Sequence, residues 1–294
     1  QGLQARLAKD GVEVDFARGY VGDVTGAYNG VTTGQNLEDK RSEAELIAEA
    51  VEKAKAADCV ILFGGLNKSD YQDCEGHDRQ QYELPYAQDK LITALAAANK
   101  NFVYVNISGN AVAMPWRDKV PAIVQGWYLG SEAGEALAAV LTGDANPSGK
   151  LPFTWVKSLQ NVGAHALNTY PGTWRKEGGS KTEGNIIDEE YKEGIYVGYR
   201  WADREKQRPV FAFGHGLSYT QFAISNLRAD KASMTAADSI TFTVQVKNIG
   251  QRAGSETVQL YVHDAKASVD RPLKELKGFC KVSLQPGESK DVSI

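Results

Sequence analysis

Four carboxylic acids lie close together after an apolar run of the sequence. They are Asp73, Glu75, Asp78 and Glu83, in or near the stretch YQDCEGHDRQQYELP at residues 71–85. Carboxyl groups are common proton donors, proton acceptors and nucleophiles in enzymes. A solvated loop is also rich in such residues. The stretch therefore raises the question of whether one of these acids is placed to move a proton.

Other reactive groups are not spaced for metal, dithiol or nucleotide chemistry. The cysteines at 59, 74 and 280 form no C-x-x-C pair, which disfavours a zinc ribbon or a redox centre. Gly64 and Gly65 follow an apolar run, but the G-x-G-x-x-G and G-K-S/T spacings of phosphate loops are absent. We therefore expect no cofactor and no metal, and a nucleotide-binding domain is only a third alternative.

Length and charge exclude several classes of partner. The 294 residues suffice for more than one domain, and 42% of them are apolar. A net charge of −4, from 33 basic and 37 acidic residues, gives no field that attracts nucleic acid or an anionic membrane. No apolar run approaches the roughly 20 residues of a membrane span. The chain lacks an initiator Met and stops inside a strand-like pattern, so we expect a fragment of a longer protein.

The first 160 residues alternate between strand-like and helix-like patterns. Ser42 and Glu45 form the sequence signature of a capping box at the start of one helix. This β-α-β-α order predicts a layered α/β sandwich with a mainly parallel sheet over residues 1–160. Ligands of such sheets bind beyond the carboxyl ends of the strands, and the acidic stretch directly follows one strand. We expect strands at 11–19, 59–65, 101–109, 122–130 and 149–155, and helices at 41–58, 86–100 and 131–143.

The rest of the chain divides into two regions with different sequence patterns. Residues 161–217 are rich in Gly, Tyr and Trp with little periodicity, which indicates an irregular connecting segment packed on the first domain. Its aromatic residues either pin the segment or stack on sugar rings. Residues 218–294 contain short alternating strands separated by turn signals, among them Pro286–Gly287. This pattern predicts an antiparallel β-sandwich that is incomplete at its C-terminal end.

Five segments of the sequence form recognisable motifs: EGHDR (75–79) with LP (84–85), GWYLGSEAGEALAAVLTGDANPSGKLPFTW (126–155), EYKEGIYVGYRW (190–201), FAFGHGLSYTQF (211–222) and RPLKELKGFCKVSLQPGES (271–289). Together they resemble the C-terminal part of glycoside hydrolase family 3, which contains many β-glucosidases and β-xylosidases. The resemblance implies an α/β sandwich followed by a fibronectin type III-like domain. It also implies a preceding barrel-type domain, which this sequence lacks.

The resemblance implies a retaining mechanism with two carboxyl groups. One is an Asp nucleophile on the missing barrel domain, and no position of this chain matches it. The other is a general acid/base, commonly a Glu followed two residues later by Asp-Arg, which here is Glu75. Gly76 would allow a tight loop, and His77 is either a loop residue or a substrate contact. Asp78 and Arg79 are expected to anchor the loop.

The resemblance does not decide which sugar is cleaved or whether the isolated chain is active. The leading hypothesis is hydrolysis of terminal β-D-glucosyl residues from a β-linked glucoside or oligosaccharide, with this chain supplying the acid/base domain and inactive on its own. A β-xylosidase of the same family is the first alternative, and a non-catalytic carbohydrate-binding or structural module is the second. Members with this layout are often periplasmic or secreted, and we expect the same here.

Overall fold

The computed structural model describes residues 2–22, 38–69, 71–75, 78–176 and 186–294. These residues belong to two compact units, Gln1–Ala138 and Ala139–Ile294. The domain limits expected near residues 160 and 217 stay predictions. Gly76 and His77 lie outside the described residues, so their expected roles also stay predictions. Among the residues described, no helix combines the length and apolar character needed to cross a bilayer.

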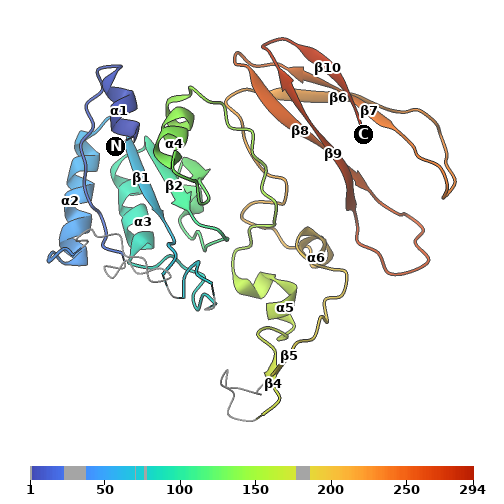
Figure 1. Cartoon of the computed structure of the whole chain (residues 1–294), viewed down its shortest axis with the longest axis horizontal. Helices are drawn as coiled ribbons and strands as arrows, with labels where there is room; N and C mark the ends of the chain where they lie inside the picture. Colours follow the sequence, from blue (N-terminus) through green and yellow to red (C-terminus); the bar gives the residue numbers. More distant parts are fainter. Residues whose placement is uncertain (1, 23–37, 70, 76–77, 177–185) are drawn as a thin grey trace. The chain divides into compact units, whose positions relative to one another are not determined.

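A parallel sheet of strand order β1-β2-β3 forms the centre of the first unit (Figure 1). Val60 pairs with Phe102 across β1 and β2, and Val103 pairs with Ala122 across β2 and β3. The central strand is the most deeply buried, with Tyr104 and Val105 fully inaccessible. The parallel arrangement predicted from the near-continuous apolar runs is confirmed. The strands are β1 (Val60–Gly65), β2 (Phe102–Ile107) and β3 (Ala122–Gln125).

Helices pack against this sheet through apolar faces. Leu91, Ile92 and Leu95 of one helix are buried, as the spacing of its apolar residues predicts. The predicted capping box is also confirmed, since Ser42 Oγ accepts from the Glu45 amide and Glu45 accepts from the Ser42 amide. The helices of this unit are α1 (Gly2–Ala8), α2 (Glu43–Ala56), α3 (Gln88–Ala98) and the short η1 (Arg117–Lys119), and α4 (Ala133–Thr142) runs from it into the second unit.

Two of the predicted strands are wrong, and a third is shorter than expected. Residues 11–19 form no strand, and Val12 and Phe16 are exposed, because alternation alone makes no ladder without a hydrogen-bonded neighbour. Residues 149–155 form only a single bridge between Trp155 and Phe211. The strand expected at 122–130 ends at Gln125, and the left-handed backbone of Trp127 (φ 55°) turns the chain away.

The irregular part of the second unit is held by its aromatic residues. Trp155 and Trp201 are buried, Tyr196 donates its hydroxyl hydrogen to Asp270, and Tyr199 accepts from the Leu276 amide. These contacts favour the pinning role over sugar stacking for the residues involved. The elements here are η2 (Leu159–Asn161), α5 (Gly163–Ala166), β4 (Thr173–Trp174), β5 (Ile187–Asp188) and α6 (Tyr199–Arg204).

The second unit ends in antiparallel sheets of order β10-β7-β6 and β8-β9. Val246, Val258, Leu284 and Val292 form their shared buried core, and Gly287 takes the positive φ of 77° that the predicted turn needs. The predicted antiparallel β-sandwich is confirmed. Its strands are β6 (Phe222–Ala229), β7 (Phe242–Asn248), β8 (Gly254–Val262), β9 (Glu275–Leu284) and β10 (Ser289–Ser293).

Candidate active site

The site begins where β1 ends, and the backbone there is tightly held. The Gln88 side chain accepts from the Gly65 amide at 2.7 Å and donates to the Gly65 carbonyl at 2.8 Å. A Cβ on Gly65 would lie 2.0 Å from the Ile107 carbonyl oxygen, at a φ of 129°. Close packing and an unusual backbone therefore account for this glycine without any phosphate ligand.

The chain after β1 folds back on itself before it reaches the acids. Asn67 accepts from the Ser69 amide with its side chain and from the Asp73 amide with its carbonyl. Tyr71 adopts a left-handed backbone, with φ 62°. Non-glycine residues in this region cost free energy and cluster at functional sites. Tyr71 and Trp127 both follow strands of the parallel sheet, so the strain lies where ligands bind in such folds.

Asp73 is engaged in hydrogen bonds through both carboxylate oxygens. Oδ2 accepts from the Gly109 amide at 2.7 Å and from the Tyr128 hydroxyl at 2.9 Å, and Oδ1 accepts from the Asn110 side-chain amide at 3.3 Å. Burial, with a further contribution from the Asp73 hydrogen bond, raises the pKa of Tyr128, which therefore remains a donor. Asp73 thus accepts hydrogen bonds from the segments that follow β2 and β3.

Glu75 lies two residues beyond Asp73 in a different environment. Its side chain is exposed, and it makes no hydrogen bond or ion pair within the part of the chain that the structure describes. Asp78 and Glu83 are also exposed. Three of the four acids singled out from the sequence therefore have accessible side chains, and Glu75 is the exposed acid that lies two residues from the engaged Asp73.

Arg79 contacts the same part of the fold as Asp73. Its Nη2 donates to the Ala111 carbonyl at 2.5 Å, and its guanidinium lies 5.5 Å from the centre of the Tyr82 ring. Burial lowers the pKa of Arg79, and the charge of Asp73 opposes this shift. These contacts support the anchoring role expected for Arg79. The role of Asp78 stays a prediction.

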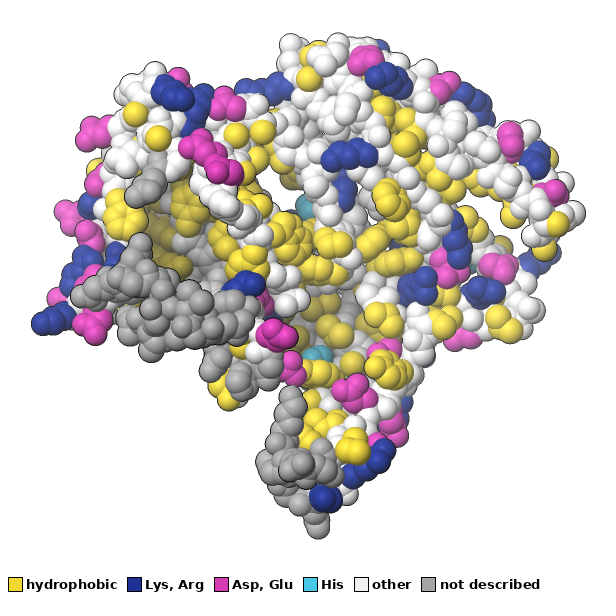
Figure 2. Space-filling view, in the orientation of Figure 1, with side chains coloured by type: hydrophobic (Ala, Val, Ile, Leu, Met, Phe, Trp, Pro, Cys, Tyr) yellow, Lys and Arg dark blue, Asp and Glu magenta, His cyan; other side chains and the backbone are white. Residues whose placement is uncertain are grey.

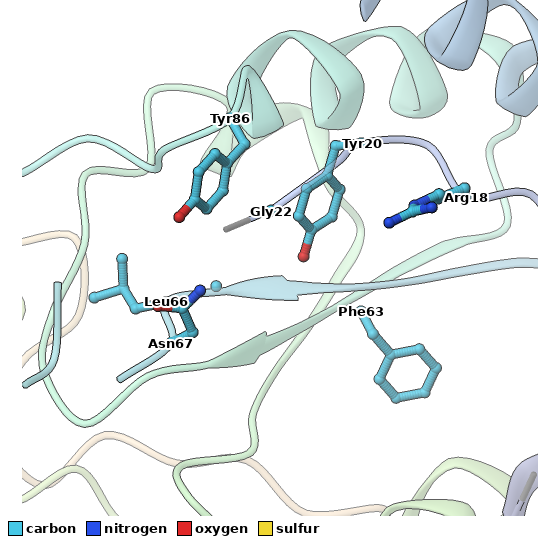
Figure 3. A pocket seen from close by; sticks show the side chains of 8 residues that line it. Arg18, Tyr20, Gly22, Phe63, Leu66, Asn67 and Tyr86 are labelled. Carbon is cyan, nitrogen blue, oxygen red and sulfur yellow. The ribbon is translucent and has the colours of Figure 1, made fainter. Parts of the chain in front are cut away.

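Two cavities lie near the end of β1. The first, of about 330 Å³, is lined by Arg18, Tyr20, Phe63 and Tyr86 among others, and Figure 3 shows the two tyrosine rings side by side above β1. Its described lining contains no carboxylate. The second, of about 190 Å³, is bordered by Tyr71, Arg79, Glu83 and neighbouring residues.

The described residues contain no cluster of His, Cys, Asp and Glu that is suited to a metal.

On the face shown in Figure 2, basic and acidic side chains of the coloured residues are interspersed. The surface drawn there has no extended region of one sign, as the near-zero net charge predicts.

Sequence reasoning missed the partners of Asp73. Tyr128 lies 55 positions away in the chain, and Gly109 and Asn110 lie 36 and 37 positions away. One signal could have found them. Each follows a strand of the predicted parallel sheet, and the carboxyl ends of such strands meet at one edge.

A parallel sheet covered by helices, followed in the chain by antiparallel sheets, defines a protein with an α/β part and an all-β part. The glycosyl hydrolase family 3 C-terminal domain model matches residues 2–199, and the fibronectin type III-like domain model matches residues 256–294. The chain therefore belongs to glycoside hydrolase family 3 and corresponds to the C-terminal portion of its members.

Individual relatives agree with this assignment. The chain is 46% identical over 293 residues to the β-glucosidase BoGH3A of Bacteroides ovatus, covering 97% of this chain and 37% of that protein. The structure of a family 3 β-glucosidase from Bifidobacterium adolescentis matches with a TM-score of 0.80 and 36% identity, covering 99% of this chain and 38% of that one. A Kluyveromyces marxianus β-glucosidase in complex with glucose matches with a TM-score of 0.75 and 40% identity, over 87% of this chain and 29% of its own. The chain thus spans between 29% and 38% of the length of these relatives.

Proposed function

We propose that this chain is the acid/base part of a retaining β-glucosidase and that Glu75 is its general acid/base. The observation that carries the proposal is the contrast between Glu75 and Asp73. Glu75 presents an accessible carboxyl group, whereas both oxygens of Asp73 are occupied by donors. Membership in glycoside hydrolase family 3 gives this free carboxyl group a reaction in which to act.

In the proposed mechanism, Glu75 protonates the glycosidic oxygen while a second carboxylate attacks the anomeric carbon. Glu75 then removes a proton from the water that hydrolyses the glycosyl-enzyme. Retaining enzymes hold the two carboxyl groups about 5–5.5 Å apart. Because Glu75 is exposed here, the nucleophile and the surface that excludes water from the site come from the barrel-type domain implied by the family resemblance.

Glucose is the proposed sugar because relatives such as BoGH3A bear the name β-glucosidase. The proposed substrate is therefore a β-linked glucoside or oligosaccharide. The β-xylosidase alternative makes the same use of Glu75. A comparison of 4-nitrophenyl β-glucoside with 4-nitrophenyl β-xyloside separates the two, and a preference for the xyloside contradicts our choice of sugar.

The role of Glu75 is tested by Glu75→Ala in the protein expressed with its upstream coding sequence. We expect kcat/KM for cellobiose to fall about 10²–10⁴-fold, the usual contribution of general acid catalysis. An aryl glucoside with a good leaving group should lose much less in glycosylation. Azide should restore turnover in the second step and yield β-glucosyl azide.

The matched control is Glu52→Ala on α2, since Glu52 is also an exposed glutamate of this unit. It should retain the kinetics of the parent protein. Loss of activity in Glu83→Ala, with Glu75→Ala unchanged, would transfer the role to Glu83. A parent protein that binds glucosides without hydrolysing them would favour the non-catalytic module.

A further inference from the structure

The residues on both sides of Glu75 are tied to one short segment after β2. Asp73, two positions before Glu75, accepts from the Gly109 amide and the Asn110 side chain. Arg79, four positions after it, donates to the Ala111 carbonyl. Residues 109–111 therefore hold the chain before and after the acid.

A buried polar network fixes this segment to the sheet. Ser108 Oγ donates to the Asn110 carbonyl at 2.7 Å and accepts from Asn106 Nδ2 at 2.7 Å. Asn106 also donates to Gln125 Oε1 at 2.6 Å and accepts from the Tyr104 hydroxyl at 2.9 Å. Asn106 and Ser108 are fully buried. Satisfied buried networks of this kind make their surroundings rigid.

Asp73 connects this rigid base to the end of a third strand. Its Oδ2 accepts from Tyr128, which follows β3, as well as from Gly109, which follows β2. Asp73 itself follows β1, so one carboxylate joins the carboxyl ends of β1, β2 and β3. Hydrogen bonds to an ionised acceptor are about twice as strong as neutral ones.

Because Glu75 lies only two residues from Asp73, the hydrogen bonds of Asp73 also limit the position of Glu75. Two residues of fully extended chain span at most about 7 Å. The backbone of Glu75 therefore cannot move far while Asp73 stays bound to its partners. A displacement of about 1 Å in a catalytic group can reduce a rate about 10²-fold.

On the basis of the proposed function, we propose that Asp73 is a positioning residue that holds Glu75 at the reacting bond through its hydrogen bonds to Gly109, Asn110 and Tyr128. Asp73 carries no proton to or from substrate, since both of its oxygens accept from protein donors. It acts through Glu75 alone. If Asp73 positions Glu75, substitution of Asp73 should lower kcat only when Glu75 is present. A residue that contributes only to folding would lower kcat in both cases.

A double-mutant cycle between Asp73→Asn and Glu75→Ala tests the proposal in the protein expressed with its upstream coding sequence. Asparagine has nearly the same size as aspartate. Its NH₂ group cannot accept the hydrogen bonds that the carboxylate of Asp73 accepts from Gly109, Asn110 and Tyr128. With Glu75 present, Asp73→Asn should lower kcat for cellobiose about 10–100-fold, with a much smaller change in KM. In the Glu75→Ala background the same substitution should change kcat less than about 2-fold, because coupled residues are not additive.

Tyr128→Phe serves as a second variant that leaves Asp73 and its backbone partner in place. It should lower kcat for cellobiose by about 3–10-fold, as expected when one hydrogen bond to a charged group is lost. This effect should also disappear in the Glu75→Ala background. Asp118→Asn, at an exposed aspartate of η1 in the same unit, is the matched control and should leave kcat unchanged.

The outcomes separate the two proposals. If Glu75→Ala leaves cellobiose hydrolysis unchanged, the proposed function fails. If Glu75→Ala behaves as expected but Asp73→Asn and Tyr128→Phe reduce kcat equally with and without Glu75, the positioning role is overturned and Asp73 is only structural. Equal losses for cellobiose and for an activated aryl glucoside would overturn it as well.

Discussion

Two carboxylates separated by one residue have different environments in this chain. Asp73 is partly buried and surrounded by donors, whereas Glu75 is exposed. Environment, rather than residue type, decides which of two neighbouring acids can exchange a proton with substrate. The sequence alone shows several acids in one stretch. The structure separates the engaged Asp73 from the exposed Glu75, Asp78 and Glu83, and the sequence motif is what favours Glu75 among the exposed acids.

At the same scale, Gly65→Ala should destabilise the first unit strongly. The new Cβ would meet the Ile107 carbonyl at 2.0 Å, and the backbone has a φ of 129°. We expect the free energy of unfolding to fall by about 2–4 kcal/mol, the range for a clash combined with backbone strain. Urea denaturation followed by circular dichroism would measure this loss.

Gly11→Ala is the matched control for that substitution. Gly11 also has a positive φ, of 70°, but a Cβ there meets nothing within 4 Å. Its cost should therefore be about 1–2 kcal/mol, from the left-handed backbone alone. Equal losses for the two variants would mean that the contact with Ile107 adds nothing.

At the scale of elements, the sequence predicted correctly those features that depend on residues close together in the chain. The capping box at Ser42, the inward face of α3 and the turn at Gly287 all follow from residues a few positions apart. The strand predicted at 11–19 is wrong because strand formation requires a hydrogen-bonded neighbour, which the alternation of Val12 and Phe16 does not reveal.

The anchors of the candidate site could not be predicted in the same way. The bond between Asp73 and Tyr128 spans 55 positions, and it depends on how the ends of β1 and β3 are spaced by β2. Such a contact follows from the register of the whole sheet and from a left-handed turn at Trp127. Glu75 was predicted from a motif, whereas the hydrogen-bond partners of Asp73 became visible only in three dimensions.

The first turn of α3 contains a carboxyl group whose charge is unfavourable in the fold. Burial raises the pKa of Asp89, while the hydrogen bond from the Trp116 indole, at 2.6 Å, opposes the shift and the charge of Glu83 adds to it. Between the ordinary pKa and the raised pKa, the folded state binds more protons than the unfolded state. Stability due to Asp89 is therefore greatest at low pH and falls as pH rises through this window.

Asp89→Asn should remove this pH dependence. Asparagine retains an oxygen that can accept from Trp116, so the difference in free energy of unfolding between variant and parent should move in favour of the variant as pH rises above 4. Urea denaturation at several pH values from 4 to 8 would measure it. A difference that stays constant over this range would contradict the assignment.

At the scale of the whole molecule, the proposed function gives this chain one part of a mechanism that requires two. It spans 37% of the Bacteroides ovatus relative, and the proposed acid/base is exposed to solvent. A retaining glycosidase needs a second carboxylate about 5–5.5 Å from the first. Within the proposed function, the anchored acid of this chain serves a nucleophile on another domain.

The purified 294-residue chain should therefore not hydrolyse 4-nitrophenyl β-glucoside at a rate above that of the Glu75→Ala chain. Addition of the separately produced upstream part of the protein should restore turnover, and the same addition to the Glu75→Ala chain should not restore cellobiose hydrolysis. Intact mass spectrometry before the assay ensures that only the chain is present. Turnover by the chain alone that disappears in Glu75→Ala would mean that both carboxyl groups lie within these residues, and the nucleophile would then have to be sought among the acids near Glu75.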